Sequence, residues 1–269
     1  MIRFDAVSKV YDGVAAVSDF SLDVASHRFV VLVGSSGSGK TTLLRMVNRM
    51  VDPTSGRVLI DDVDVATSDP VRLRRSIGYV LQQGGLMPHR TVVDNVASVP
   101  LLLGTSRRRA RHDALGLLER VGLDTTLADR YPAQLSGGQQ QRVGVARALA
   151  ADPNILLMDE PFGAVDPIVR RELQDELRHL QADLGKTVLF VTLDVDEAFR
   201  LADEMLVLGR GGRIAQQGTP EQILAAPADD FVRDFIGADR AERTLSLDTT
   251  GARTIVRDGD GRPIGTVGS

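Results

Sequence analysis

Short apolar runs alternate with longer segments of mixed polarity along most of this chain. Runs rich in β-branched residues predict strands, and a continuous apolar run is typical of a strand buried on both faces of a sheet. We expect five such strands, at residues 28–33, 77–81, 155–158, 188–192 and 205–208. Because helical patterns separate them, the chain is predicted to have an α/β fold with a largely parallel sheet.

The segments between these strands show the helical period of 3.6 residues. One predicted helix follows Pro167 and carries a stripe formed by Leu173, Leu177, Leu180 and Leu184; another carries Ala114, Leu117, Leu118 and Val121. Residues 86–151 contain helical patterns and no good strand, which predicts an all-helical insertion. Thr219 begins a capping-box pattern with proline at the first helical position, and we expect that helix to end the main domain near Gly237.

Composition narrows the class of protein only a little. The formal net charge of −4 gives no overall attraction to nucleic acid, and the absence of cysteine excludes disulfides and cysteine metal sites. No apolar run is long enough to span a membrane, and the first residues lack the apolar core of a secretion signal, so we expect a soluble cytoplasmic protein. The arginines at 107–109 and 111 read as a solvated helix face, with a membrane-surface contact as the alternative.

A glycine-rich loop with one lysine follows the first of the five strands and precedes a helical pattern. This is the G-x-x-x-x-G-K-[ST] pattern in the strand–loop–helix context that it requires, and it predicts a phosphate-binding loop. Lys40 is expected to reach the β- and γ-phosphates of a nucleotide, and Thr41 to ligate Mg²⁺. The nucleotide-binding residues predicted here are Gly34, Ser35, Ser36, Gly37, Ser38, Gly39, Lys40, Thr41 and Thr42.

Two carboxylates end the strand at residues 155–158. Asp159 fits the role of holding Mg²⁺, directly or through water. Glu160 points elsewhere because it is one residue further on, so it can polarise a water for attack on the γ-phosphate. An apolar strand ending in two acids is a weak indication alone, and it becomes strong beside the phosphate loop and the next motif.

The stretch L-S-G-G-Q-Q-Q-R predicts a second anion-binding helix start. Ser136 can cap a helix, and its hydroxyl and the amides of Gly137 and Gly138 then converge on one point, with Gln139 beside them. A chain that already has a phosphate loop needs no second one for its own nucleotide. The motif therefore indicates a site that closes on the nucleotide of a second copy; a glycine helix start without a ligand is the alternative.

Together, G-S-S-G-S-G-K-T, L-S-G-G-Q and L-L-M-D-E-P resemble the nucleotide-binding subunit of an ATP-binding cassette (ABC) transporter, over about residues 2–237. The resemblance implies a P-loop NTPase (RecA-like) core at residues 1–85 and 152–237, an all-helical subdomain at about 86–151 and an antiparallel β subdomain. It also implies ATP and Mg²⁺ as ligands, and a dimer of two copies with the nucleotides between them.

The same resemblance assigns three further residues. Tyr11 matches the aromatic that stacks on adenine, and Gln82 matches the glutamine that touches Mg²⁺ and the attacking water. Asp166 matches the aspartate that communicates across the dimer. Each has a plainer interpretation as a surface aromatic, a polar strand end and a helix cap, respectively.

Within that family, the segments around residues 80–96 and 161–174 are similar to ATPases of importers for quaternary-amine osmoprotectants such as glycine betaine, carnitine and choline. Expected partners are membrane permease subunits and, indirectly, an extracytoplasmic solute-binding protein, but no nucleic acid. The expected location is the cytoplasmic face of the cell membrane. Residues 238–269, with one strand–turn–strand pattern, resemble a truncated cystathionine-β-synthase (CBS) module.

Position 193 departs from the family pattern. By resemblance, the residue between threonine and aspartate in T-x-D is a histidine that contacts the γ-phosphate and holds the water and Glu160 in register; here it is Leu193. The leucine can be a deliberate change that traps the ATP-bound state, a natural loss, or a tolerated variation. Because the other motifs are intact, we favour a single change, with slow hydrolysis as its consequence.

Three functions therefore remain open from the sequence. The first is an ATPase subunit of a membrane importer, in which Glu160, Gln82, Asp166 and residue 193 serve hydrolysis. The second is a soluble non-transport ABC ATPase, although such proteins usually carry tandem cassettes or a long coiled coil. The third is a nucleotide-dependent regulatory subunit without turnover, which Leu193 keeps open.

Overall fold

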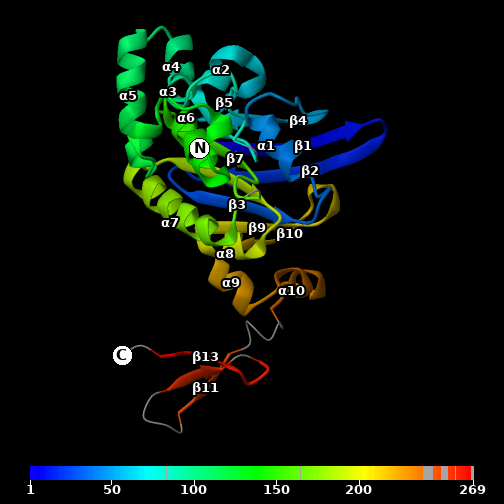
Figure 1. Cartoon of the computed structure of the whole chain (residues 1–269). Coiled ribbons are helices and arrows are strands. Elements are labelled where there is room, and N and C mark those ends of the chain that lie inside the picture. The colour runs from blue at the N-terminus through cyan, green and yellow to red at the C-terminus, as the bar shows by residue number, and fades with distance from the viewer. Residues whose placement is uncertain (83, 164, 239–244, 250–253, 258, 268–269) are drawn as a thin grey trace.

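The structure is a computed structural model that describes residues 1–82, 84–163, 165–238, 245–249, 254–257 and 259–267. Its largest sheet has six strands in the order β10-β9-β3-β8-β7-β6, all parallel except the antiparallel edge strand β10 (Figure 1). These strands are β3 Phe29–Gly34, β6 Ile77–Val80, β7 Ile155–Asp159, β8 Thr187–Thr192, β9 Glu204–Leu208 and β10 Ile214–Gly218. The five predicted parallel strands are confirmed, each within one residue of its expected ends.

The centre of this sheet is covered on both faces. Every residue of β3 and β8 is buried, and successive residues belong to two different apolar clusters. Phe29, Val31 and Val33 of β3 face one cluster, whereas Val30 and Leu32 face the other. Because side chains alternate across a strand, the continuous apolar run seen in the sequence is needed to fill both layers.

A second sheet is antiparallel, as the family resemblance implied, with strand order β2-β1-β4-β5. Its strands are β1 Ile2–Tyr11, β2 Val14–Val24, β4 Ser55–Ile60 and β5 Val63–Asp64. The hydrophobic pattern does not show β1 clearly, because its pairing with β2 shifts register three times between Phe4 and Val10 and the period of two is lost. Phe4 and Phe20 pack edge to face at 5.3 Å between ring centroids and anchor this sheet to the core.

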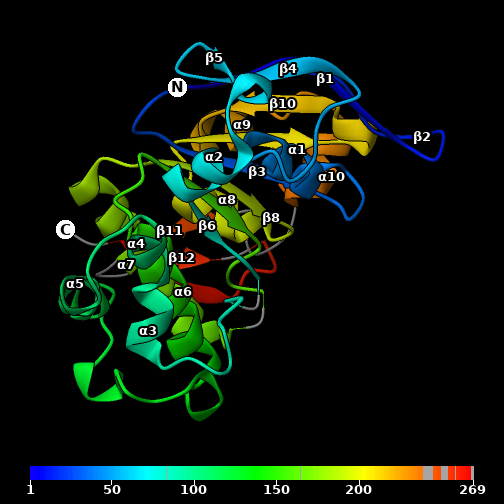
Figure 2. The ribbon, with the colours of Figure 1, turned by 90° about the horizontal axis from the view of Figure 1, so that it is seen from above.

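Helices at one end of the molecule come from the predicted helical insertion. Residues 86–151, all of which the structure describes, form helices and turns without a strand. The α-helices are α3 Val92–Val96, α4 Ser98–Leu102, α5 Arg107–Arg120 and α6 Gly137–Leu149. Figures 1 and 2 both place them at the end opposite the antiparallel strands β1, β2 and β4.

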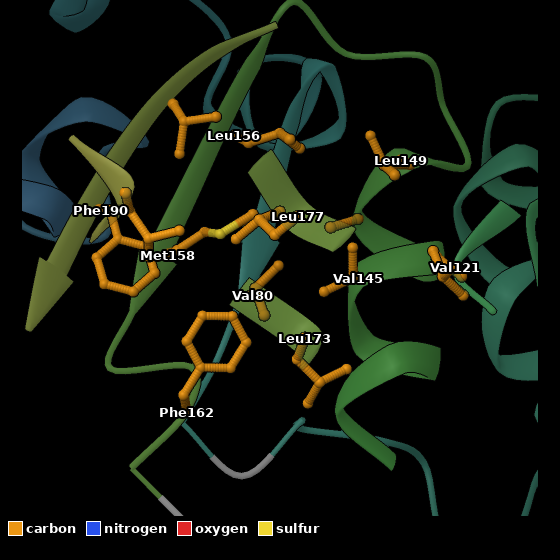
Figure 3. Close-up of a cluster of buried hydrophobic side chains, with 14 of the residues drawn as sticks. Val80, Val121, Val145, Leu149, Leu156, Met158, Phe162, Leu173, Leu177 and Phe190 are labelled. Atoms are coloured by element: carbon orange, nitrogen blue, oxygen red, sulfur yellow. The ribbon is translucent and has the colours of Figure 1, made fainter. Parts of the chain in front are cut away.

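A shared apolar cluster fastens this helical end to the large sheet (Figure 3). Val145 and Leu149 of α6 lie in one cluster with Met158 of β7, Phe190 of β8 and Phe162, which follows β7. Leu173 and Leu177 belong to the same cluster and confirm the predicted apolar face of the helix after Pro167. Outside the helical insertion, the α-helices between β3 and β9 are α1 Lys40–Val47, α2 Pro70–Ser76, α7 Pro167–Leu184 and α8 Val195–Leu201.

The C-terminal part departs from the prediction in one respect. The helix capped by Thr219 is α9 Pro220–Ala225, and a separate helix, α10 Asp230–Ile236, ends at the left-handed Gly237. Beyond it lies a small antiparallel sheet of β11 Ser246–Asp248, β12 Ile255–Arg257 and β13 Pro263–Thr266, of which β12 and β13 form the predicted strand–turn–strand. Residues 253 and 258 of that pattern lie outside the described residues. The likeness to a CBS module and the domain boundary near 237 stay predictions.

No helix in the described ranges combines the length and the apolar character needed to cross a membrane.

Candidate active site

The loop between β3 and α1 has a backbone that requires glycine. Gly39, immediately before α1, has φ of 91°, and a Cβ atom there would lie 2.6 Å from the carbonyl oxygen of Ala16. A larger residue would therefore be strained both in its own backbone and against β2. The loop is held in a compact turn by the amide of Ser38, which donates to the carbonyl of Ser35 at 3.2 Å.

Lys40 turns back into this loop. Its Nζ donates to the carbonyl oxygens of Gly34 at 2.7 Å and Ser35 at 2.9 Å and to Ser38 Oγ at 3.2 Å, and the residue is 4% exposed. Burial lowers the pKa of the Lys40 ammonium, while the charges of Glu160 and Asp159 oppose that shift. The three atoms that Lys40 contacts carry no formal charge, so an anionic phosphate in the loop would complete its surroundings.

Thr41 and Asp159 meet although 118 residues separate them in the chain. Thr41 Oγ1 donates to Asp159 Oδ1 at 2.9 Å, and the second carboxylate oxygen accepts from the Tyr79 hydroxyl at 3.3 Å. Arg45 Nη2 lies 3.8 Å from that second oxygen. A hydroxyl and a carboxylate side by side are hard oxygen ligands of the kind that Mg²⁺ prefers, so this pair fits the predicted metal site.

Glu160 lies just beyond β7 in an unusual backbone conformation. Its φ is 46°, which is uncommon for a residue with a side chain, and its amide donates to the carbonyl of Val191 on the neighbouring strand at 2.9 Å. Gln82 Nε2 donates to Glu160 Oε2 at 3.4 Å. The structure thus brings Gln82, Glu160, Asp159, Thr41 and Lys40 together at one edge of the sheet, and their roles there stay predictions.

Leu193 lies at the end of β8, on the strand next to β7. It is 46% exposed, so nearly half of this apolar residue faces solvent. The residues on either side of it are polar and well held: Asp194 donates its amide to Thr192 Oγ1 at 2.9 Å and begins α8 as its N-cap. Leucine offers neither a hydrogen-bond donor nor an acceptor at this place.

Ser136 begins α6 in the predicted way. Its hydroxyl accepts from the amide of Gln139 at 3.3 Å, and Gln139 Oε1 accepts from the amide of Ser136 at 2.9 Å. Gly137 is exposed, whereas a Cβ at Gly138 would lie 2.7 Å from Val169 Cγ1. Within the described part of the chain, none of the side-chain hydrogen bonds of Ser136 or Gln139 reaches the phosphate loop.

Asp166 and Tyr11 lie at the margins of this arrangement. Asp166 is exposed and caps α7 by accepting from the amide of Ile168 at 2.9 Å, which is the plainer of its two interpretations. Tyr11 is also exposed, and the Lys9 ammonium lies 5.1 Å from the centre of its ring. Both stay available to a partner, and their proposed roles stay predictions.

Sequence reasoning missed Tyr79 and Arg45, which lie against Asp159. Tyr79 is half-buried in β6, and burial raises the pKa of its hydroxyl, a shift to which the charge of Asp159 adds. A tyrosine within an apolar strand usually needs a polar partner for its hydroxyl, so its place in I-G-Y-V was the available indication.

A family model described as ABC transporter matches residues 17–163, more than half of the chain. The chain belongs to the ABC transporter family. As an ABC cassette it combines the P-loop NTPase core with the helical segment and the antiparallel sheet described above, and its solved neighbours are ATP-binding cassettes of the same fold.

Several curated proteins are similar to this ABC cassette. A carnitine transport ATP-binding protein of Listeria monocytogenes is 52% identical over 241 residues, which are 89% of this chain and 60% of that protein. A glycine betaine/carnitine/choline transport ATP-binding protein of Bacillus subtilis is 51% identical over 89% of this chain and 63% of its own length. A glycine betaine uptake system ATP-binding protein of Escherichia coli is 49% identical over 92% of this chain and 80% of its own. The chain thus spans about three-fifths of the first two relatives.

Solved structures agree with this placement. The dimeric ATP-binding cassette MJ0796, in a post-hydrolysis state bound to ADP and Pi, is 34% identical with a TM-score of 0.73, over 82% of this chain and 99% of that one. The cassette cbiO1 from Clostridium perfringens, part of the ABC transporter complex cbiONQ, is 28% identical with a TM-score of 0.77, over 84% of this chain and 91% of that one.

Proposed function

We propose that this chain is the ATP-binding and ATP-hydrolysing subunit of a membrane ABC importer. The observation that carries the proposal is the contact of Thr41 with Asp159 beside the buried ammonium of Lys40. A hydroxyl, a carboxylate and a cation converge there from two different strand ends. This combination suits a nucleoside triphosphate bound with Mg²⁺.

Each residue at this edge has a role in that proposal. The loop of residues 34–42 binds the phosphates, with Lys40 on the β- and γ-phosphates and Tyr11 against the adenine. Thr41, Asp159 and Gln82 hold Mg²⁺, which supplies positive charge beside the phosphate oxygens. Glu160 accepts the proton of the attacking water, and Gln82 keeps Glu160 in place through the hydrogen bond between their side chains.

The site becomes complete when a second copy supplies residues 136–139. Ser136 and Gln139 lie at the start of α6, where the helix dipole and the amides of Gly137 and Gly138 favour an anion. Two copies placed head to tail would bring each such start against the other's phosphate loop, with Asp166 at the interface. The dimeric cassette among the solved neighbours supports this arrangement.

The transport role rests on the relatives. Their names describe transport of carnitine, choline and glycine betaine, so we propose quaternary-amine osmoprotectants as the solutes, with permease subunits as direct partners and a solute-binding protein as an indirect one. Binding to a permease would place this chain at the cytoplasmic face of the membrane. Purifying the chain with its co-expressed permease and identifying the subunits that elute together, and the bound solute, tests this assignment.

A second candidate function is a nucleotide-dependent regulatory subunit that hydrolyses ATP hardly at all. Leu193 favours it, because the exposed apolar side chain cannot stabilise charge on a transferred phosphoryl group. Phosphate release by the assembled complex separates the two candidates: a regulatory subunit binds MgATP without measurable release.

Lys40→Ala tests the phosphate loop. Removing the ammonium should abolish tight MgATP binding, since Lys40 is the lysine within the loop. Lys186→Ala is the matched control, because Lys186 is similarly buried but pairs with Asp152 away from this edge. Micromolar MgATP affinity in a folded Lys40→Ala protein contradicts the assignment.

Ser136→Arg tests the shared site. We expect the isolated chain to be mainly monomeric without ATP, to dimerise with it, and to lose that shift when an arginine blocks the start of α6. Ser106→Arg is the control, because Ser106 caps the neighbouring helix α5 through the amide of Arg109. Sedimentation of the three proteins decides: a dimer indifferent to both ATP and Ser136→Arg rules out the sandwich.

A further inference from the structure

Two loops flank Glu160 at the carboxyl edge of the sheet, and one arginine contacts both. The first loop follows β7 and leads through Val165 and Asp166 into α7; the second follows β8 and carries Leu193. Arg170, in the first turn of α7, donates from Nη2 to the carbonyl of Val165 at 3.2 Å and from Nη1 to Asp194 Oδ2 at 3.3 Å. Its guanidinium therefore bridges the two loops.

Asp194 holds the second loop in place through several hydrogen bonds in addition to its contact with Arg170. One of its carboxylate oxygens accepts from the amides of Asp196 at 2.8 Å and Glu197 at 3.3 Å, and the other faces Arg170. Its own amide donates to Thr192 Oγ1. Residue 193 thus lies between two residues, Thr192 and Asp194, that hydrogen bonds hold in place. The direction of the side chain at position 193 is therefore set by these neighbours.

A buried second contact joins α7 to the same strand end. Glu197 of α8 is 4% exposed; its carboxylate accepts from Thr192 Oγ1 at 2.6 Å and from Gln174 Nε2 of α7 at 3.2 Å. Gln174 is one helical turn beyond Arg170, so both side chains lie on the same face of α7. That face holds the loop of residue 193 at two points.

The Arg170 arrangement is not the one that stability alone would favour. Its Nε is buried and has no hydrogen-bond partner among the described residues, and an unmet buried donor costs free energy. A guanidinium reaches the two acceptors from two separate nitrogens held in a fixed fork, whereas the single nitrogen of a lysine would have to lie within hydrogen-bond distance of both acceptors at once. The guanidinium thus makes both loop contacts while its Nε is left unpaired.

We propose that Arg170 is a positioning residue for ATP hydrolysis, which holds the turn before Asp166 and the loop of residue 193 at a fixed separation on either side of Glu160. The inference rests on the proposed ATPase function. The amide of Glu160 donates a hydrogen bond to the carbonyl of Val191 in β8, so Glu160 stays with the strand and a shift of the loop after it moves the group at position 193 relative to Glu160. Misplacement of a reacting group by about 1 Å can lower a rate by up to about 10²-fold.

The chain offers a matched control on the same two helices. Arg200 of α8 binds Asp175 of α7 through Nη2 at 2.7 and 2.8 Å, but these residues are exposed and distant in sequence from Val165. Arg170→Lys and Arg200→Lys each weaken one ion pair between α7 and the α8 segment. Only the first also releases the turn before Asp166.

Hydrogen exchange tests the bridge without any need for catalysis. We expect Arg170→Lys to accelerate exchange of the amides of Val165 and Asp194 together, by about fivefold or more, because both lose the same restraint. Arg200→Lys should leave both amides unchanged. Acceleration at only one of the two loops, or equal effects of the two variants, overturns the bridge.

Single-turnover release of labelled phosphate tests the effect on hydrolysis. In protein carrying Leu193→His, Arg170→Lys should lower the rate about tenfold with MgATP affinity unchanged, whereas Arg200→Lys should change neither. An unchanged rate for Arg170→Lys overturns the positioning role even if exchange is accelerated. Absence of phosphate release with either residue at position 193 rejects the proposed ATPase function instead, and MgATP binding, measured separately, shows whether the nucleotide site itself has failed.

Discussion

The loops after β7 and β8 lie side by side at the same edge of the sheet, but only the first has side chains that hydrogen-bond to other residues of the candidate site. After β7, Asp159 and Glu160 contact Thr41, Tyr79 and Gln82. After β8, the backbone is held just as well, yet the side chain that it presents is an exposed leucine. The backbone at position 193 is thus held in place without a polar side chain, so a single substitution should supply one.

The largest expected effect comes from replacing Glu160 in the loop after β7. With histidine restored at position 193, Glu160→Gln should lower turnover by about 10²-fold or more, because removal of a general base typically costs 10²–10⁴ in rate. MgATP affinity should persist, since Lys40 and Thr41 are unchanged. Steady-state phosphate release and equilibrium nucleotide binding measure the two quantities, and a drop smaller than threefold means that another residue is the base.

Adding a hydrogen-bond donor at position 193 tests the loop after β8. Leu193→His should raise turnover at least about tenfold, because one preorganised donor at a developing charge is worth about 10²–10³ in rate. Leu193→Ala is the control: it removes the leucine without adding a donor, so its turnover should stay at the original level. Comparable turnover for all three proteins, measured with the permease bound, would show that leucine is tolerated there.

The two loops also differ in how far sequence could describe them. The phosphate loop and the acids of β7 were predicted because each depends on local spacing: Lys40 must follow its glycines, and Asp159 must end its strand. Their meeting at the sheet edge then follows from the parallel order of the strands, since carboxyl ends gather at one edge. The absence of a donor at position 193 was equally visible, as it concerns a single residue.

Contacts that depend on packing between distant elements were not predictable in this way. Tyr79 reaches Asp159 because β6 is the neighbour of β7, and Arg170 reaches Asp194 because the first turn of α7 lies beside the end of β8. Neither neighbour relation is written in the local pattern of apolar residues. The antiparallel strand β1 escaped for another reason, as its register shifts interrupt the alternation that would have revealed it.

A moderate effect should follow from removing the hydrogen bond that Tyr79 donates to Asp159 at the end of β7. Tyr79→Phe removes the hydroxyl that contacts Asp159 and should raise the Mg²⁺ concentration needed for half-maximal ATP binding by roughly two- to tenfold, the range for one hydrogen bond. Tyr131→Phe alters an exposed tyrosine outside this edge and should have no effect. Equal Mg²⁺ requirements for Tyr79→Phe and the original protein would show that Asp159 needs no support from β6.

The smallest effect concerns the stability of the β8 loop. Burial raises the pKa of the Glu197 carboxyl, and the hydrogen bond from Thr192 only partly opposes the shift. A raised carboxyl pKa means that the folded protein binds this proton more tightly than the unfolded chain does, so the associated stability is present at low pH and is lost as pH rises from about 4.3 through the folded value.

Glu197→Gln carries no titratable group at this position. The free energy of unfolding of the original protein, relative to that of Glu197→Gln, should therefore fall as pH rises through this range and then level off, when both are followed by urea unfolding at a series of pH values. A difference that is constant, or that grows with pH, would mean that the pKa of Glu197 is not raised in the folded protein and that its carboxylate stays charged beneath the loop of residue 193.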